Sequence, residues 1–340
     1  MRIAIANDND ANLTILRHIV EKSTDHDIAW TAINGSEAIE KCKHDLPDII
    51  LMDMIMPGIN GVQACEAIME ETPCAILIVT ASVASNAAMV FEAMSKGALD
   101  VVQTPFSGIE NNKQEMADFL RKINVVRSLV KKDNEKDSTR SASGTTSSNG
   151  EDNSIVVIGS STGGPGVLAT ILSQLPANFP VPVIIVQHVD SSFTDSFASW
   201  LNKQSELEVR IARQGERPQA GSVLIAGESD HLIMLADGKL AYSEEPKEMI
   251  YRPSVDIFFN SVVKHWKGSI VAALLTGMGK DGAQGLANIH KLGGHTITQT
   301  KDSCAVYGMP KAADEIGAAT ESLAPNEIAS SIINVLNGKE

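Results

Sequence analysis

Short apolar runs rich in β-branched residues, each followed at once by a polar turn, recur through the second half of this chain. Three such runs are residues 154–158, 181–186 and 270–275. Runs of this length, bounded by Gly or Pro, indicate buried strands. If the strands are parallel, their carboxyl ends lie along one edge of the sheet, where open α/β folds place ligands. We therefore expect the three polar turns to meet at one edge.

The three turns contain a serine, a histidine and an aspartate at positions 161, 188 and 281. Ser161 needs a base to become a nucleophile, His188 can take and return its proton, and Asp281 can fix the imidazole tautomer. The backbone amides of the turn 277–279 could stabilise an oxyanion. The set is therefore a candidate centre for acyl transfer.

Each of these residues also has a simpler interpretation. The segment 159–163 has the pattern G-x-S-x-G, but a glycine-rich turn before a helix could instead bind a phosphate. Asp281 could be the N-cap of the helix that follows it, and a lone histidine at a strand end is more often structural. The coincidence of all three residues on one predicted edge favours catalysis.

Length and composition limit the alternatives. The chain has 340 residues, enough for two domains, and hydrophobic residues make up 43% of it, as in a globular protein. Its net charge of -14 argues against a nucleic-acid partner, which requires clustered Lys and Arg. No apolar run is long enough for membrane insertion, and we expect no signal peptide and a cytoplasmic location. Paired spacing is absent from the cysteines, which we interpret as buried thiols: Cys42, Cys65, Cys74 and Cys304.

One polar segment divides the chain. Residues 131–153 are Lys-, Asp-, Ser-, Gly- and Asn-rich and contain no apolar residue larger than Ala. Such a segment cannot bury a face and is typical of a flexible linker. We therefore predict a domain at 1–125, a linker at 126–153 and a second domain at 154–340.

The first domain alternates strand-like and helix-like stretches. The predicted strands are 3–6, 28–32, 49–52, 75–79 and 99–102. Helical spacing of apolar residues lies between them. Five βα units of this length predict a doubly wound parallel sheet, so both domains are expected to be α/β.

Polar residues follow four strands of this first domain: Asn7, Asp8, Asp53, Thr80 and Thr104. Two carboxylates at neighbouring strand ends can bind Mg²⁺, and Asp53 could then attack a phosphoryl group that Thr80 would hydrogen-bond. Asp8 could instead only cap the next helix. The joint pattern at four strand ends favours the phosphoryl site.

Residues 1–125 resemble the receiver domain of two-component response regulators. The matching parts are the acidic turn at 7–8, the run 51–61, Thr80 and the turn at Thr104. The resemblance implies that a sensor histidine kinase phosphorylates Asp53, with Mg²⁺ bound by Asp8, Asp53 and the backbone carbonyl of Ile55. This chain departs from the family pattern in having Asn7 where a second Asp is usual and Thr104 where a Lys is usual. We expect both changes to weaken the switch.

Residues 154–340 resemble the chemotaxis protein-glutamate methylesterase family (CheB). The matching motifs are 159–164, 187–188, 251–256, 275–283 and 306–310, in the family's order. The resemblance implies a Rossmann-like methylesterase domain with catalytic Ser161, His188 and Asp281, and an oxyanion hole at Met278. It implies hydrolysis of glutamate γ-methyl esters, and deamidation of glutamines, on the cytoplasmic helices of chemoreceptors. The family needs no cofactor at the esterase site.

Three further expectations complete the interpretation. Asn7-Asp8 and the run 72–80 look like the subgroup that regulates surface-growth chemosensory pathways (Wsp type). The receiver is expected to restrain the catalytic domain until Asp53 is phosphorylated. A small antiparallel hairpin is expected between residues 224 and 242, around the turn at 237–238.

Two other classes of function remain open on the sequence. One is a phosphorylation-gated binding protein that makes little use of its hydrolase site, and the intact triad argues against it. The other is a nucleotide-binding oxidoreductase built on the turn 159–164. That class predicts an acidic residue after the next strand, whereas this chain has Gln187-His188.

Overall fold

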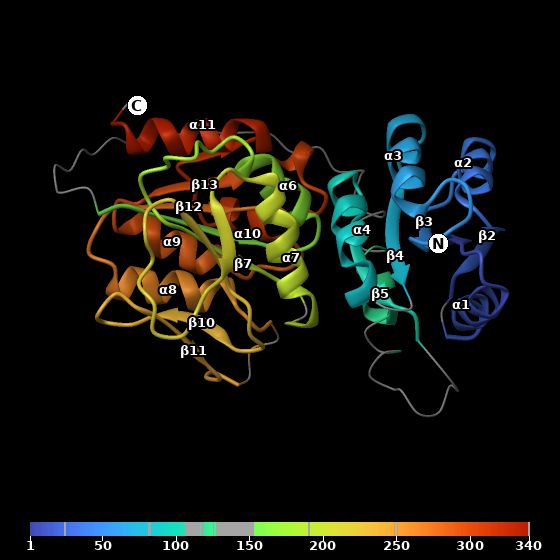
Figure 1. Cartoon of the computed structure of the whole chain (residues 1–340), viewed down its shortest axis with the longest axis horizontal. Coiled ribbons are helices and arrows are strands. Elements are labelled where there is room, and N and C mark those ends of the chain that lie inside the picture. Colours follow the sequence, from blue (N-terminus) through green and yellow to red (C-terminus); the bar gives the residue numbers. More distant parts are fainter. Residues whose placement is uncertain are drawn as a thin grey trace. The chain divides into compact units, whose positions relative to one another are not determined.

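The protein is known here from a computed structural model, which describes residues 1–23, 25–80, 83–105, 116, 119–124, 126, 153–189, 191–247, 249 and 251–338. The chain forms two compact units, Met1–Ser138 and Thr139–Glu340 (Figure 1). The predicted linker at 126–153 lies outside the described residues except for its two terminal positions. The two units are described separately.

The first unit is built from a five-stranded parallel sheet with the strand order β2-β1-β3-β4-β5. Its strands are β1 (Arg2–Ala6), β2 (Asp27–Ala32), β3 (Ile49–Met52), β4 (Ala75–Thr80) and β5 (Asp100–Gln103). Its helices are α1 (Asp10–Ser23), α2 (Gly35–His44), α3 (Gly61–Glu71) and α4 (Val83–Ser95). Each predicted strand overlaps an observed one.

Apolar burial explains why this sheet forms. Strand β3 is buried along its whole length, as expected for a central parallel strand covered on both faces. Alternate side chains of the central strands pack against α1 and the helical residues 119–124 in one core, which includes Ile5, Leu16, Leu51 and Phe119. Local signals begin the helices as well, since Asn60 and Gln63 form a capping box at the start of α3.

The second unit contains a seven-stranded parallel sheet with the order β14-β13-β12-β6-β7-β9-β8. Its strands are β6 (Ile155–Ser160), β7 (Val183–Gln187), β8 (Glu208–Ile211), β9 (Ser222–Ile225), β12 (Ile270–Leu274), β13 (His295–Gln299) and β14 (Glu321–Leu323). Its helices are α6 (Gly164–Leu172), α7 (Ser191–Gln204), α8 (Val255–His265), α9 (Ala283–Lys291), α10 (Met309–Glu315) and α11 (Pro325–Leu336).

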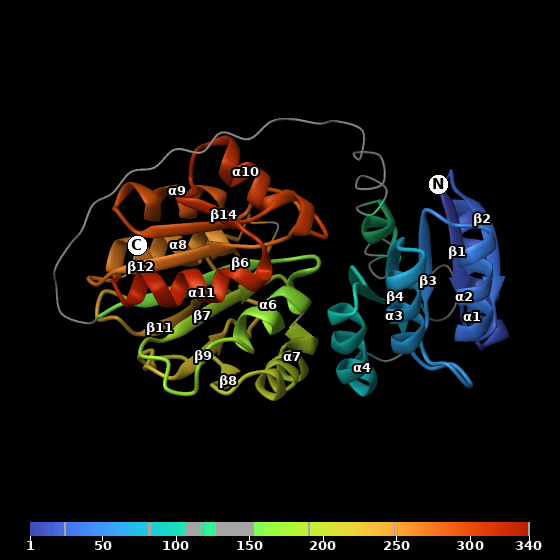
Figure 2. The same ribbon diagram turned by 90° about the horizontal axis from the view of Figure 1, so that it is seen from above.

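Helices cover both faces of this sheet. In Figures 1 and 2, α6, α7 and α11 lie on one face and α8, α9 and α10 on the other. The core on the second face joins sheet residues such as Ile155 and Leu274 to Phe258, Phe259 and Leu286 of the helices. Burial of five such large side chains contributes on the order of 10 kcal/mol before the loss of chain entropy is counted.

A separate two-stranded antiparallel sheet pairs β10 (His231–Met234) with β11 (Leu240–Ser243). This is the predicted hairpin, with its turn at Gly238 in the left-handed conformation that favours glycine. The fold class of two parallel α/β units plus a small hairpin is therefore confirmed. In the described part of the chain, no helix is both long and apolar enough to cross a membrane.

Candidate active site

The three predicted turns follow strands that are neighbours in the second sheet, in the order β12-β6-β7. The pairing aligns Gly159 with Leu274 on one side and Ser160 with Gln187 on the other. Because the strands are parallel, their carboxyl ends lie together. The edge predicted from the sequence is therefore present, and it contains Ser161, His188 and Asp281.

The nucleophile candidate lies in a tight turn between β6 and α6. Gly163 ends the turn with φ of 79°, a conformation that residues with a side chain rarely adopt. The Ser161 amide donates to the Thr276 carbonyl at 3.0 Å, which ties the turn to the segment after β12. Gly277 lies directly against Ser161, since a Cβ there would be 2.8 Å from the Ser161 Cβ. Glycine is thus required at 277 for close approach.

Gln187 connects the serine turn to the histidine strand. Its Oε1 accepts a hydrogen bond from Ser160 Oγ at 2.6 Å, and its Nε2 donates to the Ser161 carbonyl at 2.9 Å. The same nitrogen donates to the His188 carbonyl at 3.1 Å. Gln187 is buried, so these bonds are shielded from water and fix the two backbones relative to each other.

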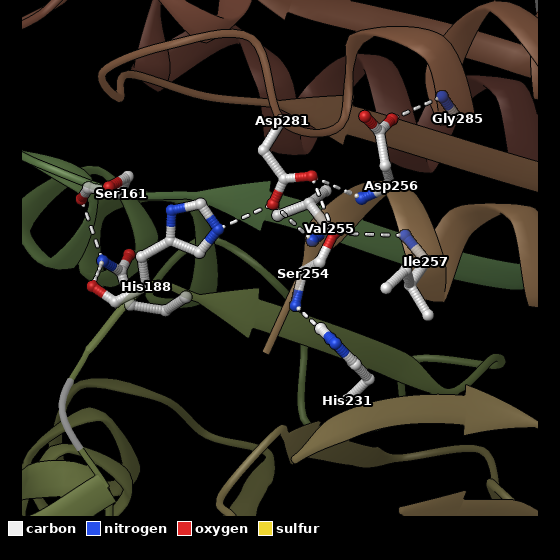
Figure 3. A network of polar contacts seen from close by, with 10 residues as sticks. Ser161, His188, His231, Ser254, Val255, Asp256, Ile257, Asp281 and Gly285 are labelled. Carbon is white, nitrogen blue, oxygen red and sulfur yellow. Dashed lines mark hydrogen bonds and ion pairs between the residues drawn. The ribbon is translucent and has the colours of Figure 1, made fainter. Parts of the chain in front are cut away.

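His188 and Asp281 form the charge-orienting pair of the site. His188 Nε2 lies 2.8 Å from Asp281 Oδ2, and both side chains are buried. His188 Nδ1 is also buried, and within the described residues it has no hydrogen-bond partner. Figure 3 shows the ring between Asp281 and Ser161, with its Nδ1 on the serine side. A proton on Nε2 therefore leaves the Nδ1 lone pair available as a base toward Ser161.

A hydrogen bond between Ser161 Oγ and His188 is absent, both residues being within the described part of the chain. Catalytic hydrogen bonds are often long before substrate binds and shorten in the reacting complex. The orientation of the ring agrees with a serine–histidine pair that closes on substrate.

Asp281 lies at the N-terminus of α8, and both of its oxygens are fully engaged. Oδ1 accepts from Ser254 Oγ at 2.8 Å and from the Asp256 amide at 3.0 Å. Oδ2 accepts from the Val255 amide at 2.8 Å and from His188. Burial alone would raise the pKa of Asp281, but the bonds from His188 and the two amides outweigh it and lower the pKa below its usual value. Asp281 is therefore ionised whenever the site works.

Tyr251 covers one face of the His188 imidazole. Its ring is stacked on His188 with a centroid distance of 4.4 Å and an interplanar angle of 5°. Its hydroxyl reaches the turn after β12, since it would lie 3.6 Å from a Cβ at Gly279. The stacked ring holds the imidazole in its plane and shields that face from water.

The predicted oxyanion turn is only partly free. The Gly277 amide is occupied, because it donates to the Val306 carbonyl at 3.0 Å. Of the described residues, none accepts a hydrogen bond from the amides of Met278 or Gly279. Met278 thus stays the candidate donor to an oxyanion, whereas Gly277 does not fit that role.

Three residues of this site had no assigned role in the sequence. Tyr251 and Ser254 belong to the motif 251–256, but their part in holding His188 and Asp281 depends on where α8 begins. His231, on β10, is fully buried and accepts from the Ser254 amide through Nδ1 at 3.1 Å. The sequence signal available for His231 was a histidine directly before the apolar run 232–234.

The first unit has its own polar edge, where Asp53 follows β3. Asn7 Nδ2 donates to Asp53 Oδ2 at 2.9 Å, and the Ile55 amide donates to Oδ1 at 3.3 Å. Burial raises the pKa of Asp53 to about 6, and the charge of Asp8 adds to the rise, although its hydrogen bonds oppose it. Asp53 is thus a buried carboxylate whose charge is incompletely compensated.

The two threonines of this edge lie on adjacent strands. Thr80 Oγ1 accepts from Asn86 Nδ2 of α4 at 3.0 Å, and the Thr104 amide donates to the Thr80 carbonyl at 2.9 Å. Thr104 is fully buried, and its hydroxyl has no hydrogen-bond partner among the described residues. No ammonium group therefore comes from position 104.

The two carboxylates at this edge, of Asp8 and Asp53, are oxygen ligands of the kind that a divalent cation prefers. The charge of Asp8 contributes to the raised pKa of Asp53, and a cation at this edge would offset that charge. Asn7 brings no negative charge to this edge, and its amide oxygen accepts a hydrogen bond from the Asn9 amide at 2.9 Å. In the described residues, no group of three or more His, Cys, Asp or Glu is placed to bind a metal.

Comparison with known families and structures supports both units. Residues 156–332 match the family model described as CheB methylesterase, and residues 3–121 match the response regulator receiver domain. In structure, the chain is similar to the CheB methylesterase catalytic domain of Thermotoga maritima, with a TM-score of 0.52 and 40% identity. That match covers 53% of this chain and 97% of the solved one.

Similarity to curated proteins extends over nearly the whole chain. A Pseudomonas aeruginosa protein named protein-glutamate methylesterase/protein-glutamine glutaminase 3 is 45% identical over 99% of this chain and 100% of its own length. A Pseudomonas putida protein named protein-glutamate methylesterase/protein-glutamine glutaminase of group 3 operon is 48% identical over 94% of this chain and 95% of its own. The similarity thus includes the receiver unit, the catalytic unit and their order.

Proposed function

The chain belongs to the CheB methylesterase family, and we propose that Ser161, His188 and Asp281 carry out its reaction. It is a protein-glutamate methylesterase and protein-glutamine glutaminase with a response-regulator receiver domain. The observation that carries the assignment of residues is the His188–Asp281 bond of 2.8 Å, which leaves Nδ1 free on the serine side (Figure 3).

In the proposed acylation step, Ser161 Oγ attacks the γ-carbonyl carbon of a methylated glutamate while His188 Nδ1 takes the serine proton. The carbonyl oxygen becomes an oxyanion, which accepts a hydrogen bond from the Met278 amide. Asp281 stabilises the imidazolium through Nε2. The tetrahedral intermediate then expels the methoxy group, His188 returns the proton to it, and methanol leaves.

Water completes the cycle. His188 Nδ1 takes a proton from water, the hydroxide attacks the acyl-serine, and the proton returns to Ser161 Oγ as glutamate is released. With a glutamine substrate the same steps release ammonia in place of methanol. The esterase site thus needs no cofactor for either reaction.

For the receiver, we propose that Asp53 accepts the phosphoryl group, with Asp8, Asp53 and the Ile55 carbonyl as the residues that would bind Mg²⁺. The cation supplies positive charge that offsets the phosphoryl oxygens. Thr80 is the proposed hydrogen-bond donor to the phosphorylated side chain, and Thr104 leaves that group without an ammonium partner. Asn7 supports Asp53 by donating to Oδ2.

The proposed partners follow from the chemistry of the two units. A sensor histidine kinase is the proposed phosphodonor, and the cytoplasmic helices of methyl-accepting chemoreceptors are the proposed substrate. Both would place the protein in the cytoplasm. With a net charge of -14, nucleic acid is not a proposed partner.

The test is release of methanol from methylated receptor by the full chain, with and without a small-molecule phosphodonor and Mg²⁺. We expect release to rise with phosphodonor in the native chain and not in Asp53→Asn. Asp53→Asn is the matched control because it is nearly isosteric with the native side chain but cannot be phosphorylated. An equal response of the two proteins would show that Asp53 is not the acceptor, and absence of methanol under all conditions would contradict the esterase assignment.

A further inference from the structure

We propose that His231 is a positioning residue for the methylesterase reaction, acting through Ser254 to hold Asp281 in place. The inference rests on the proposed catalytic role of Asp281. His231 touches neither Ser161 nor His188 in the described contacts, and it comes from the hairpin strand β10, outside the main sheet. Its contribution would be to the geometry of the triad aspartate.

The chain of contacts from His231 to the catalytic pair is continuous (Figure 3). His231 Nδ1 accepts from the Ser254 amide at 3.1 Å, and Ser254 Oγ donates to Asp281 Oδ1 at 2.8 Å. Asp281 Oδ2 then accepts from His188 Nε2 at 2.8 Å. Each of these hydrogen bonds has a normal length and is buried or largely buried, so displacing one group also displaces the next.

Ser254 is the central residue of this series of hydrogen bonds, because it contacts both His231 and Asp281. It is the N-cap of α8, with extended backbone angles, and its hydroxyl also accepts from the Ile257 amide at 3.4 Å. The next two amides, of Val255 and Asp256, both donate to Asp281. The angle at which α8 begins therefore sets the positions of three hydrogen-bond donors to Asp281, which are the Ser254 hydroxyl and the amides of Val255 and Asp256.

His231 can fix that angle only in one neutral form. Nε2 lies 3.3 Å from the Pro246 carbonyl, which can only accept, so the ring proton belongs on Nε2. Nδ1 is then a lone pair directed at the Ser254 amide. Complete burial lowers the pKa of His231 and keeps the ring neutral, with Arg252 acting in the same direction and Asp281 and Asp230 opposing it.

The chemistry of the two ring positions can be separated, because Asn places an acceptor oxygen near the position of Nδ1, whereas Gln places its amide near the position of Nε2. His231→Asn keeps the bond to the Ser254 amide, and His231→Gln keeps the bond to Pro246. The two variants have similar polarity and form a matched pair.

The test measures the rate at which a fluorophosphonate labels Ser161 in the full chain, followed by mass spectrometry. Ser161 Oγ attacks phosphorus, the P–F bond breaks, fluoride leaves and His188 takes the proton. We expect His231→Asn to label within about threefold of the native rate. His231→Gln and His231→Leu are expected to label at least about tenfold more slowly, because the Ser254 amide loses its acceptor and Asp281 is held less firmly.

Methanol release supplies the second readout, where kcat should fall in His231→Gln with KM nearly unchanged. The inference is overturned if Gln restores labelling as well as Asn does. It is also overturned if folded His231→Asn is as slow as His231→Gln, or if His231→Leu labels at the native rate. Failure of the native chain to label at Ser161 would instead overturn the proposed active site, and this inference with it.

Discussion

The two sheet edges of this protein each bury one aspartate of a proposed site, and the pKa values of the two carboxylates shift in opposite directions. Asp53 and Asp281 are both more than nine-tenths buried. The pKa of Asp53 is raised to about 6, whereas the pKa of Asp281 is lowered. Burial is therefore not what separates them, since it raises the pKa of both.

The difference comes from the groups around each carboxylate. Asp281 accepts from two amides of a helix N-terminus, a serine hydroxyl and an imidazole. Asp53 is supported by the Asn7 amide group and nearby backbone amides, and it faces the charge of Asp8. A fully compensated carboxylate can orient a base without changing protonation. An incompletely compensated one is stabilised by an added cation, which suits a site where phosphoryl transfer depends on Mg²⁺.

The largest expected effect is at the esterase edge. Ser161→Ala should lower methanol release by a factor on the order of 10³ or more, and His188→Ala should match it, because triad residues act as a unit. The double variant should be little slower than either single one. Rates are measured by methanol release, with circular dichroism to check the fold. Losses that multiply in the double variant would contradict the assignment of these two residues to one catalytic unit.

The comparison of the two carboxylates can be tested directly by replacing each with asparagine and measuring the free energy of unfolding at pH 7 without added divalent cation. Asp281→Asn should destabilise by roughly 1–3 kcal/mol, because an amide nitrogen would meet hydrogen-bond donors. Asp53→Asn should destabilise less than Asp281→Asn, because the donor that its amide nitrogen would meet is offset by removal of a buried carboxylate whose pKa is raised to about 6.

The pH dependence should also differ in sign. The Asp281 contribution is present above the unfolded pKa of about 4 and is lost as pH falls through the lower folded value. The Asp53 penalty is absent below pH of about 4, grows as pH rises from about 4 to about 6, and is fully present above that. Denaturant unfolding between pH 3 and 8 measures both. A stabilising Asp281→Asn, or an Asp53→Asn that destabilises at least as much as Asp281→Asn, would show that the two carboxylates do not differ in this way.

The smallest expected effect concerns position 104. Thr104→Lys should increase activation by phosphodonor by a few-fold, because an ammonium can pair with the phosphoryl group on Asp53. Thr104→Val is the matched control, since it has nearly the same shape and removes only a buried hydroxyl without a partner in the described residues. Activation is the ratio of methanol release with and without phosphodonor. If Thr104→Lys responds no more strongly than Thr104→Val, the missing ammonium does not limit the switch.

Much of the architecture follows from local patterns. The runs that predicted strands at 49–52 and 270–275 correspond to β3 and β12 because buried parallel strands need continuous apolar residues. Parallel pairing then places the following turns at one edge, which is why Ser161, His188 and Asp281 could be grouped in advance. The free amides of the turn 277–279 were predicted less well, since the Gly277 amide is occupied by Val306.

Other parts of the site depend on contacts between distant segments. Tyr251 stacks on His188, and His231 contacts Ser254, across 63 and 23 positions of sequence. The spacing of apolar residues along the chain does not predict contacts between segments this far apart in the sequence. Asn7 likewise reads as a lost ligand in the sequence, while in the fold it donates to Asp53.

The two α/β units, the sheet edges of the proposed sites and the residue types at those edges can be predicted from the sequence, because strand burial and parallel pairing depend on local composition. The contacts of the folded chain are needed to show which ring nitrogen of His188 faces Ser161, and that the start of α8 surrounds Asp281 with hydrogen-bond donors. They also decide the opposite pKa shifts of Asp53 and Asp281. The physical reason is that groups from different elements set the direction of each hydrogen bond and the electrostatic environment of each carboxylate. The local sequence around a residue does not predict which distant groups will contact it.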